Sequence, residues 1–155
     1  NLRGPRADGG WRLEAEACDR YGLTLMDFAA RSRAAPDKQM LQAAGALFDE
    51  IELPAMMHCK SGADRAGLMA ALYLLIAEKR PAREAARQLA WKYGHVKQAK
   101  TGLLDAFFAA YFPYEDQGMG FFDWVDDVYD PAAITREFKT KDWAVRLSDS
   151  ILHRE

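Results

Sequence analysis

The chain has 155 residues, a formal net charge of -2 and a hydrophobic content of 50%. This length suits one domain with a substantial core, and the composition excludes a disordered or collagen-like chain. The mildly acidic balance gives no global reason to bind nucleic acid or an anionic membrane surface, so neither is an expected partner. Every apolar run is shorter than the roughly 18 residues that a membrane span needs.

The cysteine content indicates a reducing environment. Cys18 and Cys59 are the only two cysteines, too few for a disulfide framework, so we expect a cytoplasmic protein. Cys18 shares the apolar face of a short predicted helix with Trp11 and Leu13, and Gly22 ends that helix. We therefore expect Cys18 in the core.

Strand-like and helical patterns alternate in the first part of the chain. "LTLMDF" (23–28) is strand-like, and a helix opened by Pro36 and Asp37 follows the polar loop after it. "LPAMMH" (53–58) is short and apolar, which predicts a buried strand with Met56 in the core.

Helical patterns fill the rest of the chain. A stretch that is apolar on most sides predicts a buried helix, and later prolines and glycines mark the limits of two more. The predicted helices cover residues 65–80, 81–94 and 102–112, the last ended by Pro113. Asp130 and Pro131 open a final amphipathic stretch that includes Ile134, Phe138, Trp143, Val145, Leu147, Ile151 and Leu152. The order of elements predicts an α/β fold with a helical second half.

The stretch "MMHCKSGADRAGLM" places polar residues between the predicted strand and the buried helix. The first amides of a helix lack internal partners, and the dipole makes that end positive. Gly62, with the small residues Ser61 and Ala63, lets the backbone close around a tetrahedral anion. The loop is therefore a predicted oxyanion cradle.

Two side chains give this cradle chemistry. A helix N-terminus and a nearby guanidinium lower the pKa of a cysteine, so Cys59 is a candidate thiolate nucleophile. The planar fork of Arg65 can hold two phosphate oxygens and stabilise developing negative charge. Five residues separate the two, enough for the loop to surround one anion.

"HCKSGADRAG" resembles the loop of the cysteine-dependent tyrosine and dual-specificity phosphatase superfamily, whose pattern is His-Cys, five residues, then Arg. His58, Cys59, Gly62, Arg65 and Gly67 match it. The resemblance implies a three-layer sandwich with a mostly parallel central sheet flanked by helices, and a phosphate loop between a central strand and a buried helix. It also implies hydrolysis of phosphate esters through a phosphocysteine intermediate.

The resemblance divides the chain at residue 113. Residues 1–113 are the expected catalytic domain, and the opening "NLRG" suggests that further strands precede it. Residues 114–155 are the expected acidic, aromatic and helical extension, packed on the same domain. Oligomeric state cannot be inferred.

The resemblance also assigns residues to roles. Cys59 is the nucleophile and Arg65 the clamp, with the phosphate held by Lys60, Ser61, Gly62, Ala63 and Asp64. His58 more plausibly fixes the loop by hydrogen bonding than acts as a base. No metal site is expected, because His95 and His153 lack partners at ligand spacing, and no cofactor is expected.

The general acid lies outside the matched motif or at its Asp64, and one position of the motif departs from the superfamily pattern. Superfamily members carry an acidic aspartate on a loop upstream of the cysteine, and Asp27 is the favoured candidate. Asp64 is the second, because some lipid-directed relatives place an acid before the arginine; Asp37 is better explained as a helix residue. Ala66 replaces the usual Ser or Thr, whose hydroxyl helps the sulfur leave, so the second step is expected to be slow.

Clustered cations point to a multiply charged substrate. Arg31, Arg33 and Lys38 follow Asp27, and "GHVKQAK" could add His95, Lys97 and Lys100 to the same rim. A phosphoinositide, an inositol phosphate or a phosphorylated protein would suit such a rim, with phosphotyrosine the superfamily default. The alternative is that these are ordinary solvated charges.

Two other functions stay open. Ala66 and the uncertain acid also fit a phosphate-binding interaction module without catalysis. A rhodanese-like sulfur carrier also has a cysteine in an amide-lined loop, but such a carrier needs no arginine at the position of Arg65.

Overall fold

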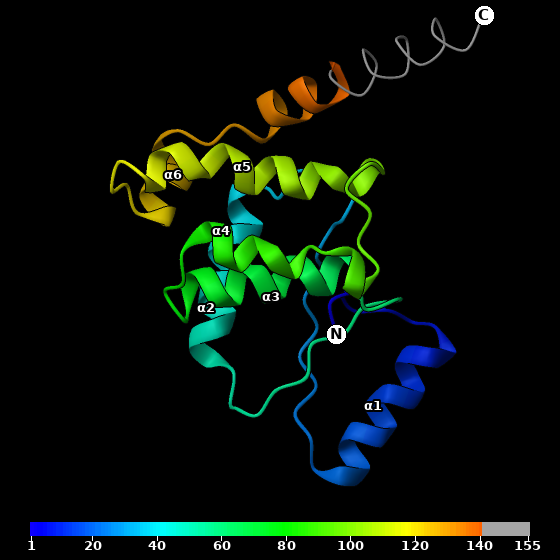
Figure 1. Ribbon diagram of the computed structural model, residues 1–155. Coiled ribbons are helices and arrows are strands. Elements are labelled where there is room, and N and C mark those ends of the chain that lie inside the picture. Colours follow the sequence, from blue (N-terminus) through cyan, green and yellow to red (C-terminus); the bar gives the residue numbers. More distant parts are fainter. Residues whose placement is uncertain (141–155) are drawn as a thin grey trace, which may run out of the picture.

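The computed structural model describes residues 1–140. The predicted apolar positions Trp143, Val145, Leu147, Ile151 and Leu152 lie outside this range. Helices and short 3-10 turns are the regular elements of the described chain (Figure 1). In order they are α1 (Gly9–Tyr21), α2 (Lys38–Glu50), α3 (Asp64–Ile76), α4 (Ala82–Ala85), η1 (Ala86–Gln88), η2 (Trp91–Tyr93), η3 (Lys100–Gly102), α5 (Leu103–Glu115) and α6 (Phe121–Asp127). Residues 131–140 are also helical.

The predicted three-layer α/β sandwich is wrong. Residues 1–140 contain no sheet, and their one strand-like pairing is an antiparallel bridge between Arg3 and Ala29. Residues 53–58 form no strand and are largely exposed: Leu53 is 66% and Met56 85% accessible, so Met56 is not in the core. Pro54 cannot donate to a strand ladder, and Met and Ala favour strands only weakly, so this segment does not recruit neighbours into a sheet.

Backbone hydrogen bonds join three short segments in place of a sheet. The amide of Leu2 donates to the carbonyl of His58, and the amide of Ala30 donates to the carbonyl of Leu2. The amide of Phe28 donates to the carbonyl of Asn1 in the same way. The N-terminal residues therefore lie between the segment near residue 29 and the start of the cysteine loop.

The predicted N-cap at Asp130 is confirmed, and the predicted helix start at Asp37 is confirmed with Asp37 as its N-cap instead of a first-turn residue. The side chain of Asp8, for which the sequence gave no cap prediction, likewise accepts from a backbone amide at the start of α1. Gly22 ends α1 with a left-handed φ of 65°. Such caps satisfy orphan amides and carbonyls, so sequence alone locates these boundaries well.

Two predicted helix limits are wrong. The helix predicted over 81–94 is instead α4 followed by separate 3-10 turns, because the backbone leaves helical geometry at Leu89 and Ala90. That bend buries Leu89 near Gly67 of α3, so tertiary packing overrides the local pattern. Pro113 does not end α5, which continues to Glu115. A proline this near the end forfeits little of the helical hydrogen bonding.

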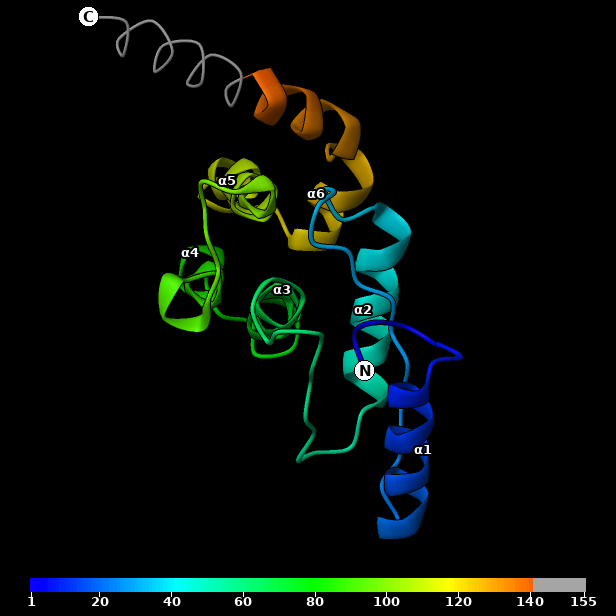
Figure 2. The ribbon, with the colours of Figure 1, turned by 90° about the vertical axis from the view of Figure 1, so that its right-hand side faces the viewer.

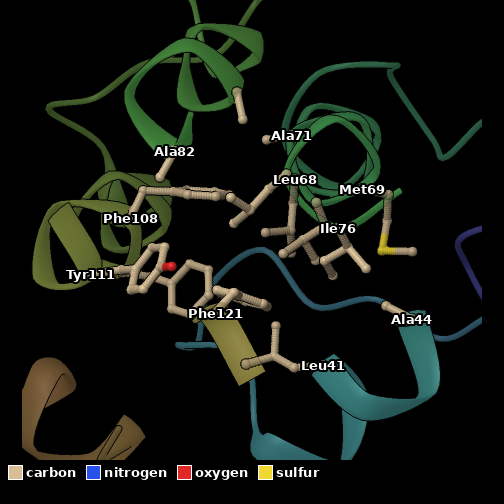
Figure 3. Close-up of a cluster of buried hydrophobic side chains, with 14 of the residues drawn as sticks. Leu41, Ala44, Leu68, Met69, Ala71, Ile76, Ala82, Phe108, Tyr111 and Phe121 are labelled. Carbon is tan, nitrogen blue, oxygen red and sulfur yellow. The ribbon is translucent and has the colours of Figure 1, made fainter. Parts of the chain in front are cut away.

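α3 is the central helix of the bundle, as Figure 2 shows by looking along its axis with α4, α5 and α2 around it. Leu68, Met69 and Leu72 are fully buried. Figure 3 shows Leu68 and Ile76 of α3 directed toward Phe108, Tyr111 and Phe121. Aromatic rings from α5, α6 and Tyr129 complete this core, with Trp124 packed on several of them. The stretch that begins at Cys59 therefore ends at the start of a helix packed in the centre of the core. Along residues 1–140, no helix combines the length and apolarity required to cross a bilayer.

α1 contributes no buried residue, unlike α2, α3, α4, α5 and α6. It projects away from the bundle in both ribbon views (Figures 1 and 2). Cys18 is a free thiol of intermediate exposure and does not belong to the core cluster, so its predicted core placement is wrong. Polar contacts, described below, hold α1 near the loop.

We expect Leu72→Ala to lower the free energy of unfolding by about 2–5 kcal/mol, because it opens a cavity in the centre of the bundle. Leu13→Ala is the matched control, since Leu13 lies on α1 and is 68% exposed. It should change stability by no more than about 0.5 kcal/mol. Urea unfolding followed by circular dichroism measures both, and equal losses would contradict the central role of α3.

Candidate active site

The Cys59–Arg65 loop runs into the N-terminus of α3. Lys60, Ser61 and Gly62 are exposed and Ala63 is buried. Ala63 is the N-cap residue, and no side chain makes a capping hydrogen bond there. The first amides of α3 are therefore not capped by a side chain, and they carry the positive end of the helix dipole.

Gly62 permits the loop conformation. Its φ of 71° lies in the left-handed region, and a Cβ built there would meet nothing within 4 Å. Glycine is therefore favoured here by backbone conformation and not by lack of space. This turn brings successive amides to one side of the loop.

The sulfur of Cys59 lies among these amides. Burial is the largest single influence on the thiol and raises its pKa, but hydrogen bonds from the backbone amides of Ser61, Ala66 and Gly62, and then the charge of Arg65, together outweigh it. The net effect lowers the pKa of Cys59. Amides and a guanidinium favour the thiolate, which is the nucleophilic form.

Arg65 also faces the polar loop that follows residue 27. With Arg31 and Arg33 it lines one open pocket of about 310 Å³, which Ala30, Ser32 and Ala34 complete. The loop after residue 27 and the Cys59–Arg65 loop, which were expected to share a basic rim, therefore meet at this pocket. Lys38 does not line this pocket, and its Nζ instead donates to the carbonyl of Asp126, 2.8 Å away.

His58 fixes the near end of the loop. Its Nε2 pairs with the carboxylate of Glu14 on α1, and its backbone carbonyl accepts from the amide of Leu2 at 2.8 Å. Both contacts hold the chain immediately before Cys59. This arrangement is structural in kind, since neither contact places the imidazole on a reacting atom.

Both carboxylate oxygens of Asp27 are occupied. Oδ1 accepts from Nδ2 of Asn1 at 2.7 Å, and Oδ2 accepts from Nε1 of Trp11 at 2.9 Å. Asp27 thus links α1 and the N-terminal segment to the loop that carries Arg31 and Arg33. To act on a substrate, its carboxyl group has to release one of these donors.

Asp64 has a different setting, which the sequence did not reveal. Its Oδ1 lies 2.8 Å from Nδ1 of His95, whose Nε2 lies 2.7 Å from Oδ2 of Asp105 on α5. His95 is only 2% exposed, so it does not lie on the basic rim where the sequence placed it. No spacing rule links residues 64, 95 and 105, because their proximity depends on how α5 packs beside α3.

The loop thus combines a thiol with a lowered pKa, backbone amides that act on its sulfur, and a guanidinium that also lines a basic pocket with Arg31 and Arg33. These are the groups that a cysteine-based phosphatase brings to a phosphate ester. Residues 15–85 match the family model described as the tyrosine phosphatase family, which confirms the resemblance inferred from "HCKSGADRAG". The match supports a phosphatase, a hydrolase that acts on a phosphorylated substrate.

The matched segment includes the second half of α1, all of α2, the Cys59–Arg65 loop, α3 and α4. His95 and Asp105 lie beyond it. No curated protein and no solved structure gave a match to the chain.

We expect alkylation of Cys59 by iodoacetamide to show a midpoint below the ordinary pKa of a free cysteine, near about 8.5, because its thiolate is stabilised. A Cys18→Ser background leaves Cys59 as the one thiol that reports. Arg65→Met should raise the midpoint only part of the way, since the amides contribute more than the guanidinium. A wild-type midpoint at or above the free value would contradict the described environment.

Proposed function

We propose that the protein is a phosphomonoesterase that works through a phosphocysteine intermediate. The observation that carries the proposal is the sulfur of Cys59 set among the amides of Ser61, Gly62 and Ala66, with Arg65 acting on it. A phosphate bound in this loop would present its phosphorus to the thiolate. Its oxygens would be held by the amides and by the guanidinium.

The first step transfers the phosphoryl group to sulfur. The Cys59 thiolate attacks phosphorus, an S–P bond forms and the P–O bond to the leaving alcohol or phenol breaks. An acid gives its proton to the departing oxygen, which avoids release of a high-energy alkoxide. Arg65 stabilises the charge that spreads over the equatorial oxygens as the transition state forms.

The second step returns the enzyme to its starting state. The conjugate base of the same acid takes a proton from water, the water oxygen attacks phosphorus, and the P–S bond breaks to release inorganic phosphate and the thiolate. Ala66 offers no hydroxyl to the departing sulfur, so the amides and Arg65 stabilise it alone. Slow hydrolysis of the intermediate follows from this substitution.

The acid is Asp27 or Asp64. Asp27 lies at the start of the loop that reaches the pocket, but Asn1 and Trp11 occupy its oxygens. Asp64 lies within the Cys59–Arg65 loop, and among the contacts of residues 1–140 only its Oδ1 is engaged, by Nδ1 of His95. Asp27 follows the pattern of the superfamily, and Asp64 follows the pattern of its lipid-directed members.

The substrate is a phosphorylated protein, with phosphotyrosine foremost, or a phosphoinositide or inositol phosphate. Arg31 and Arg33 beside Arg65 support a substrate with more negative charge than one monoester. A free thiol at Cys59 fits the reducing, cytoplasmic setting that the two unpaired cysteines suggest.

Cys59→Ser should lower turnover of p-nitrophenyl phosphate by roughly 10³-fold or more while the affinity for orthovanadate is kept, because the amides and Arg65 remain. Cys18→Ser is the matched control and should retain turnover. Both proteins are then assayed on phosphotyrosine peptides, phosphoserine peptides and a short-chain phosphoinositide. Unchanged turnover in Cys59→Ser removes the proposal.

The same panel separates the second candidate, a phosphate-binding module, which Ala66 favours. In that case the wild-type protein binds a phosphopeptide or phosphoinositide and releases no phosphate from any substrate. A single burst of alcohol product equal to the enzyme concentration instead marks an enzyme whose second step is slow.

Asn variants of the two aspartates identify the acid. The variant that lacks the acid should lose at least about tenfold more kcat/KM on phenyl phosphate than on p-nitrophenyl phosphate, because kcat/KM reports formation of the phosphocysteine, in which a poor leaving group needs the proton more. The other variant should lose equally on both substrates. Thermal unfolding of each variant shows whether a loss reflects folding, and equal ratios in both would indicate that neither residue is the acid.

A further inference from the structure

His95 is one of two buried polar residues in the described part of the chain, the other being Thr101. It lies between η2 and η3, outside the segment that matches the tyrosine phosphatase family. Burying an imidazole without hydrogen-bond partners costs free energy, so the groups that contact His95 indicate its role. Here both ring nitrogens are engaged, and both partners are carboxylates.

The geometry joins two helices through one ring. Nδ1 lies 2.8 Å from Asp64, the first residue of α3, and Nε2 lies 2.7 Å from Asp105 in α5. Asp64 and Asp105 are themselves partly buried, with side chains 26% and 17% exposed. Two such contacts require a hydrogen on each ring nitrogen if both partners are ionised.

The two carboxylates favour the doubly protonated ring. Burial is the largest influence and favours the neutral ring, but the hydrogen bonds and charges of Asp105 and Asp64 together outweigh it and raise the pKa of His95. These carboxylates, one from α3 and one from α5, are the charged groups that act on the ring. The bridge therefore places a buried imidazole between two carboxyl groups, one on each ring nitrogen.

This bridge ends at the point where the loop becomes helix. Asp64 immediately precedes Arg65, and its side chain does not cap α3 but reaches outward to His95. Asp105 belongs to the helix that supplies Phe107 and Phe108 to the core. A rigid helix thus holds the residue next to the arginine of the loop.

We propose that His95 is a positioning residue of the Cys59–Arg65 loop, which fixes the start of α3, and with it Arg65, by joining Asp64 to Asp105. The proposal rests on the proposed phosphatase function but adds a group that the family match does not contain. Misplacement of a clamp by about 1 Å can cost on the order of 100-fold in rate, so a support outside the loop can matter for turnover.

The pH dependence has a definite sign. A raised pKa means that the bridge is intact at low pH and is lost as the pH rises through that value, because the ring then gives up one of its two donors. The wild-type kcat should therefore fall on an alkaline limb. His95→Gln, whose neutral amide cannot donate to both carboxylates as a cation does, should start lower and lack that limb.

His95→Gln tests the proposal, with Asp105→Asn as a second variant. We expect kcat on p-nitrophenyl phosphate to fall by about 10- to 100-fold in each variant, with the alkaline limb absent. Arg83→Gln is the matched control, because Arg83 pairs with Asp116 and likewise joins the α4 region to α5, but on an exposed surface away from the loop. It should keep both the rate and the limb.

A readout without turnover separates this proposal from the proposed function. Inorganic phosphate should protect Cys59 from iodoacetamide in the wild type, and His95→Gln should need at least about tenfold more phosphate for equal protection. If the wild type hydrolyses no substrate yet shows this difference, the phosphatase proposal fails and the positioning role stands. A folded His95→Gln or Asp105→Asn with wild-type kcat, pH profile and phosphate protection overturns it, as does a wild-type kcat that stays flat to pH values well above the titration of His95.

Discussion

The described structure depends on the stabilisation of one anion, the thiolate of Cys59. Burial alone would keep the Cys59 thiol protonated, and the opposing contribution comes mainly from backbone amides. Backbone amides can be aimed at one atom only if the chain around them is held still. The rest of the molecule can be understood as the means of holding it still.

Two kinds of support meet at the loop. From behind, α3 is buried on nearly all sides, so its N-terminus cannot shift without disturbing the core of α2, α4 and α5. At its ends, polar contacts fix the flanking residues: His58 pairs with Glu14 before the cysteine, and Asp64 reaches His95 before the arginine. Apolar packing thus sets the position of the helix, and polar side-chain contacts set the position of the loop.

Local signals in the sequence predicted what local physics determines. Asp37 and Asp130 identified helix starts because capping involves residues only a few positions apart. The loop was likewise recognisable, since Cys59, Gly62 and Arg65 need only a fixed spacing. The sheet was predicted from short apolar runs, and residues 53–58 show why this failed: an extended segment becomes a strand only when partners supply a ladder. His95 was assigned to the surface because nothing near it in sequence reveals Asp64 or Asp105.

The attachment of α1 has a consequence of its own. Because this helix buries no residue, it is tied to the loop chiefly by Glu14 with His58 and by Trp11 with Asp27. A few partly exposed polar contacts open at a lower free-energy cost than an apolar core does. α1 can therefore detach from the loop while the bundle stays folded, so local opening and global unfolding become separable properties of this chain.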